Sequence, residues 1–252
     1  PDSTPPDGTF LQDANVHVVP TLPRPELHVP FVDPTFGTTI VRLTDPSMSA
    51  SDSEHVTLGL RHQYSRQPAL NADHTKMVVR VLGGVYRGFF EVREVATGAL
   101  LQRLAPDGDP EVSWHPTDPN RFFYRAGNEV RSFAVDSGLS ETMMRFAQYV
   151  YSSTREEGRP SDGWRYYAFL GYRDNSFASA DIVVADLVEK RIVATWPNSG
   201  IPDWVSMSPS GEYVVAMWVS GEGTRVYSRT TLELLNLAFS DFGHADFAFD
   251  GE

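Results

Sequence analysis

The sequence predicts an all-β fold, a β-propeller of four-stranded antiparallel blades, and three observations support this. Short runs of β-branched and aromatic residues recur along the chain, divided by turn residues. A polar tight turn recurs between such runs, near positions 73, 118, 162, 210 and 250. The intervals of 45, 44, 48 and 40 residues match the length of one propeller blade.

The composition fits a folded, acidic protein. The 252 residues include 33 Asp and Glu against 21 Lys and Arg, a net charge of -12, and 41% are hydrophobic. This balance disfavours nucleic-acid binding, which needs clustered positive charge. The sequence contains no run of 18 apolar residues, so no membrane-spanning helix is expected. The absence of cysteine excludes disulfides, cysteine zinc sites and thiol catalysis.

The chain divides into two parts. Residues 1–36 are rich in proline and show no sustained periodicity, so we predict an extended N-terminal arm. Residues 37–252 are predicted to form the blades. The strand-like runs span 38–43, 77–82, 89–95, 121–124, 166–170, 181–186 and 213–218.

One unit can be followed strand by strand. We predict an inner strand at 66–70, a turn at 71–76, and further strands at 77–82, 89–95 and 99–104. Residues 141–149 are the one segment where a short helix is expected. Four blades fit this order, and a fifth stops after its inner strand, at the turn near 250, so an incomplete ring is predicted. Further blades would lie on a longer protein or a second chain; alternatively, the strand at 38–43 completes the last blade.

Two sets of segments resemble known families. The turns at 71–76 and 208–212 are similar to those of TolB-like and WD40-like propellers, a resemblance that covers 37–252 and implies fold rather than function. Segments 61–66 and 243–248 resemble exported bacterial propellers, among them relatives of oligogalacturonate lyase and ulvan lyase. This second resemblance implies an extracellular or periplasmic location and, in some members, β-elimination of acidic polysaccharides.

The inner strands of a propeller line its central channel, which makes their side chains candidates for a site. Alignment on the turns places one level of residues on the same face of these strands: Gln67, Glu111, Glu156, Trp204 and Asp246. The intermediate level, on the opposite face, holds Arg66, Arg155 and Asp203.

A lyase would need a base, an acid and a cation for the substrate carboxylate. His62 could be the base, Tyr64 the acid, and Arg66 or Arg61 the cation. The alternative interpretation is structural: a tyrosine at a strand start packs in the core, and the arginine beside it anchors a neighbouring blade.

His244 and Asp246 form a His-x-Asp pair whose spacing suits a divalent metal such as Ca²⁺ or Mn²⁺. The resemblance to oligogalacturonate lyases implies metal dependence through histidines. The alternative is a structural pair that ties adjacent blades together.

Glycan binding has its own candidates: Arg61, Glu111, Trp204, Tyr172 and Arg173. Aromatic rings and arginines in loops suit sugar stacking and carboxylate binding, whereas core packing is the alternative for the tryptophans. No phosphate-binding glycine loop, Gly-x-Ser-x-Gly elbow or His-Glu-x-x-His motif occurs.

Three functions follow from the sequence. The leading hypothesis is an exported ligand-binding or scaffold propeller with a glycan as ligand. The alternatives are a polysaccharide lyase that cleaves an acidic glycan and a protein-interaction propeller. Acidic residues on the inner strands would repel an anionic glycan, which disfavours the lyase.

Overall fold

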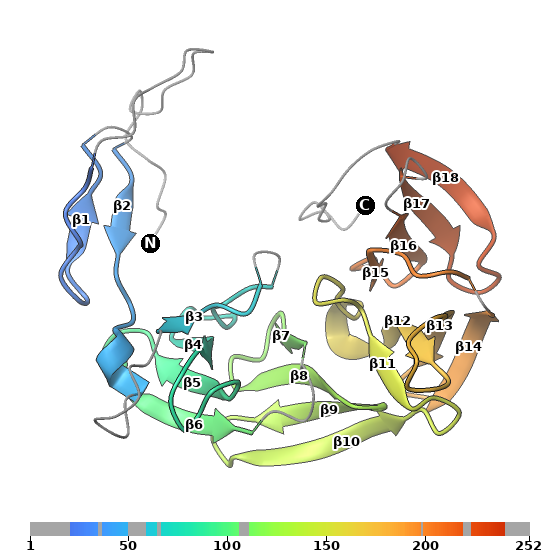
Figure 1. The fold of residues 1–252 in the computed structure, drawn as a ribbon, viewed down its shortest axis with the longest axis horizontal. Helices are drawn as coiled ribbons and strands as arrows, with labels where there is room; N and C mark the ends of the chain where they lie inside the picture. Colours follow the sequence, from blue (N-terminus) through green and yellow to red (C-terminus); the bar gives the residue numbers. More distant parts are fainter. Residues whose placement is uncertain are drawn as a thin grey trace.

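The computed structural model describes residues 21–34, 37–49, 59–64, 67–105, 111–197, 199–218 and 223–239. Its strands form four four-stranded sheets and one two-stranded hairpin. Within each four-stranded sheet the strands follow chain order and pair antiparallel. The sheets succeed one another along an arc, with the first strand of each on the concave side (Figure 1).

Each four-stranded sheet is one blade, numbered here in chain order. The first blade contains β3 (Leu60–Arg61), β4 (Lys76–Val81), β5 (Phe90–Glu94) and β6 (Leu100–Leu104). The second contains β7 (Val112–Trp114), β8 (Arg121–Ala126), β9 (Glu129–Ala134) and β10 (Leu139–Arg145). The third contains β11 (Tyr151–Ser153), β12 (Tyr166–Tyr172), β13 (Asp181–Asp186) and β14 (Arg191–Trp196). The fourth contains β15 (Trp204–Met207), β16 (Tyr213–Trp218), β17 (Gly223–Ser228) and β18 (Leu234–Phe239).

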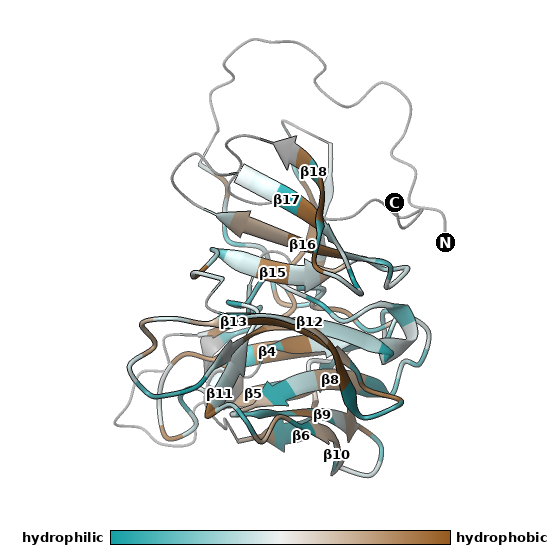
Figure 2. Cartoon of the chain, turned by 90° about the vertical axis from the view of Figure 1, so that its right-hand side faces the viewer, coloured by the Kyte–Doolittle hydropathy of each residue, from teal (hydrophilic) through white to brown (hydrophobic). Residues whose placement is uncertain are grey.

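Strand alternation explains why each blade needs its neighbours. Successive side chains of a strand point to opposite faces. On β8, Phe122 packs in a cluster with Val78 and Phe90 of the first blade. The next residue, Phe123, packs with Tyr167 of the third blade, at 5.1 Å between ring centroids. Both faces are therefore buried, and the most hydrophobic stretches run along interior strands such as β13 and β16 (Figure 2).

The recurring turn has a common hydrogen-bonding pattern. In three blades the amide of the first turn residue donates a backbone hydrogen bond to the carbonyl oxygen of the residue five positions later. Its side-chain oxygen accepts a hydrogen bond from that residue's amide nitrogen. The side-chain bonds are Asn71 Oδ1 to Lys76 N (2.9 Å), Ser161 Oγ to Tyr166 N (2.9 Å) and Ser208 Oγ to Tyr213 N (3.0 Å). Asn and Ser favour such turns because their short side chains reach the backbone.

The strand predictions agree well with the structure beyond the first inner strand. The runs predicted at 77–82, 89–95 and 99–104 are β4, β5 and β6. The inner strand predicted at 66–70 is wrong: β3 lies earlier and pairs with Val81 and Arg80, while Leu70 forms only an isolated bridge to Met77. The helix expected within 141–149 is also wrong, because β10 pairs with β9 there and Arg145 forms an ion pair with Glu129.

The N-terminal hairpin stands apart from the four blades. It contains β1 (Pro30–Val32), inside the range predicted as an arm, and β2 (Thr39–Val41). In the described residues β2 pairs with β1, whereas the outer strand of the fourth blade is β18. The hairpin and β18 lie on opposite sides of the opening in the arc (Figure 1). The ring is therefore not closed by the described strands. Residues 1–20 and the turn near 250 lie outside the described part.

No helix in the described ranges is long and apolar enough to cross a membrane.

Asp186, at the end of β13, stabilises the turn that follows in a way that depends on pH. Its buried carboxylate accepts hydrogen bonds from the amides of Val188 and Glu189, both at 3.1 Å, and from Arg165 at 3.1 Å. Burial raises the pKa of Asp186, but these hydrogen bonds and the charge of Arg165 outweigh it and hold the pKa below its ordinary value. Asp186 therefore adds stability above the unfolded-state pKa of about 4. This contribution is lost as the pH falls through the folded-state pKa.

We expect Asp186→Asn to flatten the decline in melting temperature below about pH 4. Thermal unfolding measured across this pH range tests it. Arg165→Gln, which removes one partner only, should flatten the profile less. An acid limb of unchanged slope in the Asn variant would contradict the assignment.

Candidate functional site

A polar cavity of about 440 Å³ lies at the inner strands of the arc, and we name it the channel-side hollow. Side chains from all four blades line it: Tyr64, Glu111, Arg125, Tyr151, Ser153, Arg155, Glu156, Glu157 and Asp203. Glu111 immediately precedes β7, Ser153 ends β11, and Asp203 immediately precedes β15. The ends of several inner strands thus meet at one site.

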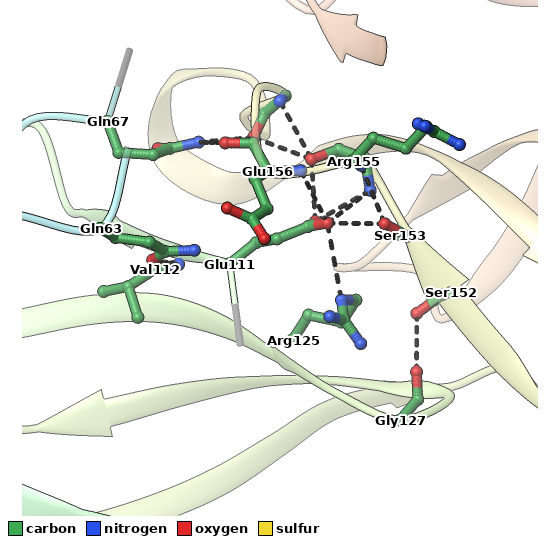
Figure 3. A network of polar contacts seen from close by, with 12 residues as sticks. Gln63, Gln67, Glu111, Val112, Arg125, Gly127, Ser152, Ser153, Arg155 and Glu156 are labelled. Atoms are coloured by element: carbon green, nitrogen blue, oxygen red, sulfur yellow. Dashed lines mark hydrogen bonds and ion pairs between the residues drawn. The ribbon is translucent and has the colours of Figure 1, made fainter. Parts of the chain in front are cut away.

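Glu111 is the centre of a hydrogen-bond network between the second and third blades (Figure 3). Its buried carboxylate accepts hydrogen bonds from Ser153 Oγ (2.8 Å) and from Thr154 N (2.9 Å) and Oγ1 (2.8 Å). It also accepts one from the amide of Glu156 at 3.1 Å. A carboxylate that accepts several such bonds is held firmly in place.

Arg125 balances this buried charge. Its side chain is 1% exposed, and its Nε lies 3.7 Å from Glu111 Oε1. Its guanidinium lies over the ring of Tyr151, 4.4 Å from the ring centroid. Burial opposes the charge of Arg125, but the negative charge of Glu111, together with the contributions of Tyr151 and Tyr167, raises the pKa of the guanidinium. The two groups therefore form a buried ion pair.

The segment after β11 is held in an unusual backbone conformation. Arg155 and Glu156 have φ angles of 61° and 69°, in the left-handed region that side chains rarely adopt. The Glu111 carboxylate binds the amides of Thr154 and Glu156, and Ser153 Oγ accepts from the amide of Arg155 at 2.8 Å. These bonds hold the turn that brings Arg155, Glu156 and Glu157 to the hollow.

Tyr64 joins the first blade to the same site. Its hydroxyl donates a hydrogen bond to Glu157 at 3.0 Å. Burial raises the pKa of Tyr64, and the hydrogen bond and charge of Glu157 add to this, together with Asp203 and Glu156. The phenol therefore stays protonated as a hydrogen-bond donor.

The charges of the hollow are predominantly negative. Four carboxylates line it, against the guanidinium groups of Arg125 and Arg155. Because Arg125 is engaged by Glu111, the remaining excess is borne by Glu156, Glu157 and Asp203. The carboxylate of Asp203 has no hydrogen-bond or ion-pair partner among the described residues and is open to a ligand.

The structure describes two of the three residues predicted for catalysis, and only one of these two lines the hollow. Tyr64 reaches the hollow, but His62 turns its Nε2 to the carbonyl oxygen of Gln67. Arg61 is exposed on β3, opposite Arg80 of β4. Arg66 lies outside the described residues.

The residues predicted to bind a ligand also lie in different places. Glu111 lines the hollow, whereas Trp204 is 1% exposed and packs with Val215 and Met217. Tyr172 is buried at the end of β12, 6.1 Å from the ring of Tyr151. Arg173 is largely exposed and pairs with Asp181.

Sequence reasoning missed a large part of the lining: Arg125, Tyr151, Ser153, Arg155, Glu157 and Asp203. Arg125 lies on β8, a second strand, so an alignment of inner strands could not find it. Arg155 and Asp203 were expected on the opposite face from Glu111. Arg155 lies in the left-handed turn at 155–156, and Asp203 precedes β15, so the strand alternation on which that expectation depended does not hold at either residue. The one useful signal was the shared level of Glu111 and Glu156.

A metal centre has no support in the described part of the chain, where no group of three or more His, Asp or Glu side chains is arranged to hold an ion. The predicted metal pair, His244 and Asp246, falls outside the described residues.

Comparisons with known proteins bear on the fold. No protein-family model and no curated protein sequence matches the chain. A solved oligogalacturonate lyase in complex with manganese is similar, with a TM-score of 0.56 and 12% identity over 82% of this chain and 58% of that one. TolB from Acinetobacter baumannii gives a TM-score of 0.49 and 16% identity over 66% of this chain and 41% of that one. The β-propeller domain of Myceliophteria thermophila Cps50 (Swd1) gives 0.47 and 10% over 69% and 55%.

This chain spans about half the length of these solved chains. The likeness to the lyase structure and the four successive blades confirm the predicted β-propeller fold. At this level of identity the likeness concerns the fold alone.

Proposed function

We propose that the chain is a ligand-binding β-propeller whose channel-side hollow binds an uncharged, hydroxyl-rich ligand of the carbohydrate class. The observation that carries the proposal is the hollow itself, a cavity of about 440 Å³ lined by polar side chains from four blades. This volume falls in the range of about 300–1,000 Å³ typical of small-molecule sites.

The lining suits a sugar chemically. The carboxylates of Asp203 and Glu156 can accept hydrogen bonds from hydroxyl groups, and Arg155 can donate to ring and hydroxyl oxygens. Tyr64 and Tyr151 add aromatic surface beside these polar groups. Because Glu111 and Arg125 are fixed by each other and by the network around them, the site is organised before a ligand arrives.

The excess of carboxylates favours an uncharged sugar over a uronate. Two like charges 4 Å apart repel by about 4 kcal/mol at an effective dielectric constant near 20. A uronate in the hollow would face Glu156, Glu157 and Asp203. This argues for binding rather than for lyase action on an acidic glycan. The extracellular or periplasmic location implied by the resemblance goes with the proposal, because polymeric glycans are met outside the cell.

Further blades form part of the same proposal. The described strands leave the arc open between the fourth blade and the N-terminal hairpin (Figure 1). Propellers avoid exposed sheet edges by closing the ring. Blades supplied by the same polypeptide or by a second chain would close this ring and complete the walls of the channel.

Asp203→Asn tests the proposed site. We expect glycan-array binding to neutral sugars, and isothermal titration of the best array sugar should show at least about tenfold weaker affinity in this variant. A hydrogen bond to a charged group contributes about 1.5–3 kcal/mol, enough for such a change. Asp136→Asn, which replaces an exposed aspartate in a turn of the second blade, is the matched control and should bind normally.

Other outcomes would favour the alternatives. A preference for uronate polymers, with rising ultraviolet absorbance from an unsaturated product, would overturn the proposal in favour of the lyase. Absence of any glycan binding, together with a stable partner in a pull-down, would favour a protein-interaction propeller.

A further inference from the structure

A second cavity, of about 320 Å³, lies among the turns that follow the inner strands of the first three blades. We name it the turn-side hollow. The strand β7 connects the two sites, since Glu111 precedes it at the channel-side hollow and His115 follows it at the second one. Its lining includes Ala72, Ser113, Trp114, His115, Asp162 and Trp164.

Apolar residues form half of the lining of the turn-side hollow, and polar residues, Asn71, His74 and Arg159 among them, form the rest. Three prolines line it, one from each blade: Pro68, Pro116 and Pro160. Leu70 and the indole rings of Trp114 and Trp164 complete the apolar part. Each tryptophan is only 5% exposed, so little of either ring surface is open to the cavity.

His115 supplies a fixed hydrogen-bond donor. Its Nδ1 accepts hydrogen bonds from the amides of Thr117 (3.2 Å) and Asp118 (2.9 Å), which places the ring proton on Nε2. Burial lowers the pKa of His115 below its ordinary value, which keeps the ring neutral at pH 7. The ring is also held edge-on against Trp164, with centroids 4.6 Å apart. Nε2 has no partner among the described residues.

Acceptors lie at the same site. Asp162 is an exposed rim residue whose carboxylate has no described partner, and Ser113 contributes a hydroxyl. An apolar cavity with a few placed polar groups is the usual composition of a small-molecule site. The turn-side hollow fits this pattern more closely than the charged channel-side hollow does.

We propose that the turn-side hollow binds a small aromatic ring that carries a hydroxyl group, a ligand of the phenol class. The cavity is large enough, because cavities of about 150 Å³ already bind benzene. A phenolic oxygen can accept a hydrogen bond from His115 Nε2 and donate one to Asp162 or Ser113, while the ring contacts the prolines and tryptophans. A sugar fits less well, because each tryptophan is only 5% exposed and offers little ring surface for stacking.

Titration with p-cresol tests this proposal. Calorimetry should show saturable binding, at least about tenfold tighter than for toluene, since toluene leaves His115 Nε2 unpaired. Ala72→Trp places a large ring at the exposed rim and should abolish binding, whereas Ala178→Trp, at an exposed alanine in a loop of the third blade, should not. Asp162→Asn keeps the rim shape and should weaken binding several-fold.

Equal affinity for toluene and p-cresol, or p-cresol binding that survives Ala72→Trp, would overturn the proposal. Tighter binding of methyl glucoside than of p-cresol would overturn the ligand class. N-acetyltyrosinamide separates the two sources of a phenol: if it binds more tightly than p-cresol, the natural ligand is a tyrosine side chain, and if more weakly, a free phenol. Asp203→Asn should leave all these affinities unchanged, so failure at one site is distinguishable from failure at the other.

Discussion

Glu111→Ala is expected to destabilise the propeller by about 3–5 kcal/mol, the cost of removing one partner from a buried ion pair. The variant leaves the Arg125 guanidinium, 1% exposed, without the carboxylate 3.7 Å away. It also removes the acceptor for Ser153 Oγ, Thr154 N and Oγ1, and Glu156 N. Buried donors left without acceptors each add to the cost.

Urea denaturation measures this effect. Glu141→Ala, at an exposed glutamate of β10, is the matched control and should change stability by less than about 0.5 kcal/mol. Glu111→Gln keeps the shape but loses the charge, so it should lie between the two. If Glu111→Ala were no more destabilising than Glu141→Ala, the hydrogen-bond network of Glu111 would not be what stabilises the contact between the second and third blades.

Glu111→Ala should also disturb the channel-side hollow. Without Glu111, nothing equivalent holds the amides of Thr154 and Glu156, and the left-handed residues Arg155 and Glu156 lose the bonds that offset their strain. The turn should relax toward ordinary backbone angles and withdraw side chains from the hollow. Ligand affinity measured on the folded fraction should therefore fall even where the protein remains folded.

The repeat made most of the fold predictable from the sequence. A turn residue such as Asn71 or Ser208 closes its loop by accepting a hydrogen bond from the amide five residues on, and this local chemistry recurs at blade spacing. Strands between such turns are marked by β-branched and aromatic residues, since both faces of a blade are buried. Local signals therefore located the second strands β4, β8, β12 and β16 correctly.

The first inner strand and the outer strand of the second blade were not predictable in the same way. Residues 66–70 have a strand-like composition, but the chain between β3 and β4 pairs only through Leu70. There Gln67, buried, donates to the carbonyl oxygens of Glu156 and Gly158 in the third blade. That contact joins residues far apart in the chain, so no local pattern reports it.

The candidate site was predictable only in part. Strand alternation correctly marked Glu111 and Glu156 as neighbours. It placed Arg155 and Asp203 on the other face, but a period of two holds only within an extended strand. Asp203 lies just before β15, and Arg155 has a left-handed backbone. Two consecutive left-handed residues change the direction of the side chains that follow. A non-glycine left-handed pair depends on distant hydrogen-bond acceptors, here on Glu111, and so leaves no signature in the adjacent sequence.

Gly158→Ala is expected to have the second large effect, for a steric reason. A Cβ at this position would lie 1.9 Å from the carbonyl oxygen of Val205 and 2.6 Å from Thr154 Cβ. Neither neighbour can yield easily, because Val205 belongs to β15 and Thr154 is bound by Glu111. We expect a loss of about 3 kcal/mol, at the upper end of the usual cost of overpacking.

The loss should be localised at the contact between the third and fourth blades. Hydrogen exchange should accelerate most in β15 (Trp204–Met207), which the 154–158 turn packs against, and less in the first blade.

Gly163→Ala is the control that separates a steric clash from the loss of backbone freedom. Gly163 has a φ of +70°, but an added Cβ would meet nothing within 4 Å, so this variant should lose only about 1–2 kcal/mol of stability. If both variants lost the same stability with the same exchange pattern, the close approach of Gly158 to β15 would not be what holds the fourth blade. If Gly158→Ala alone loosened β15, the turn that positions the hollow would also be the joint between these blades. Ligand binding at Arg155 and Glu156 would then stabilise the third and fourth blades together.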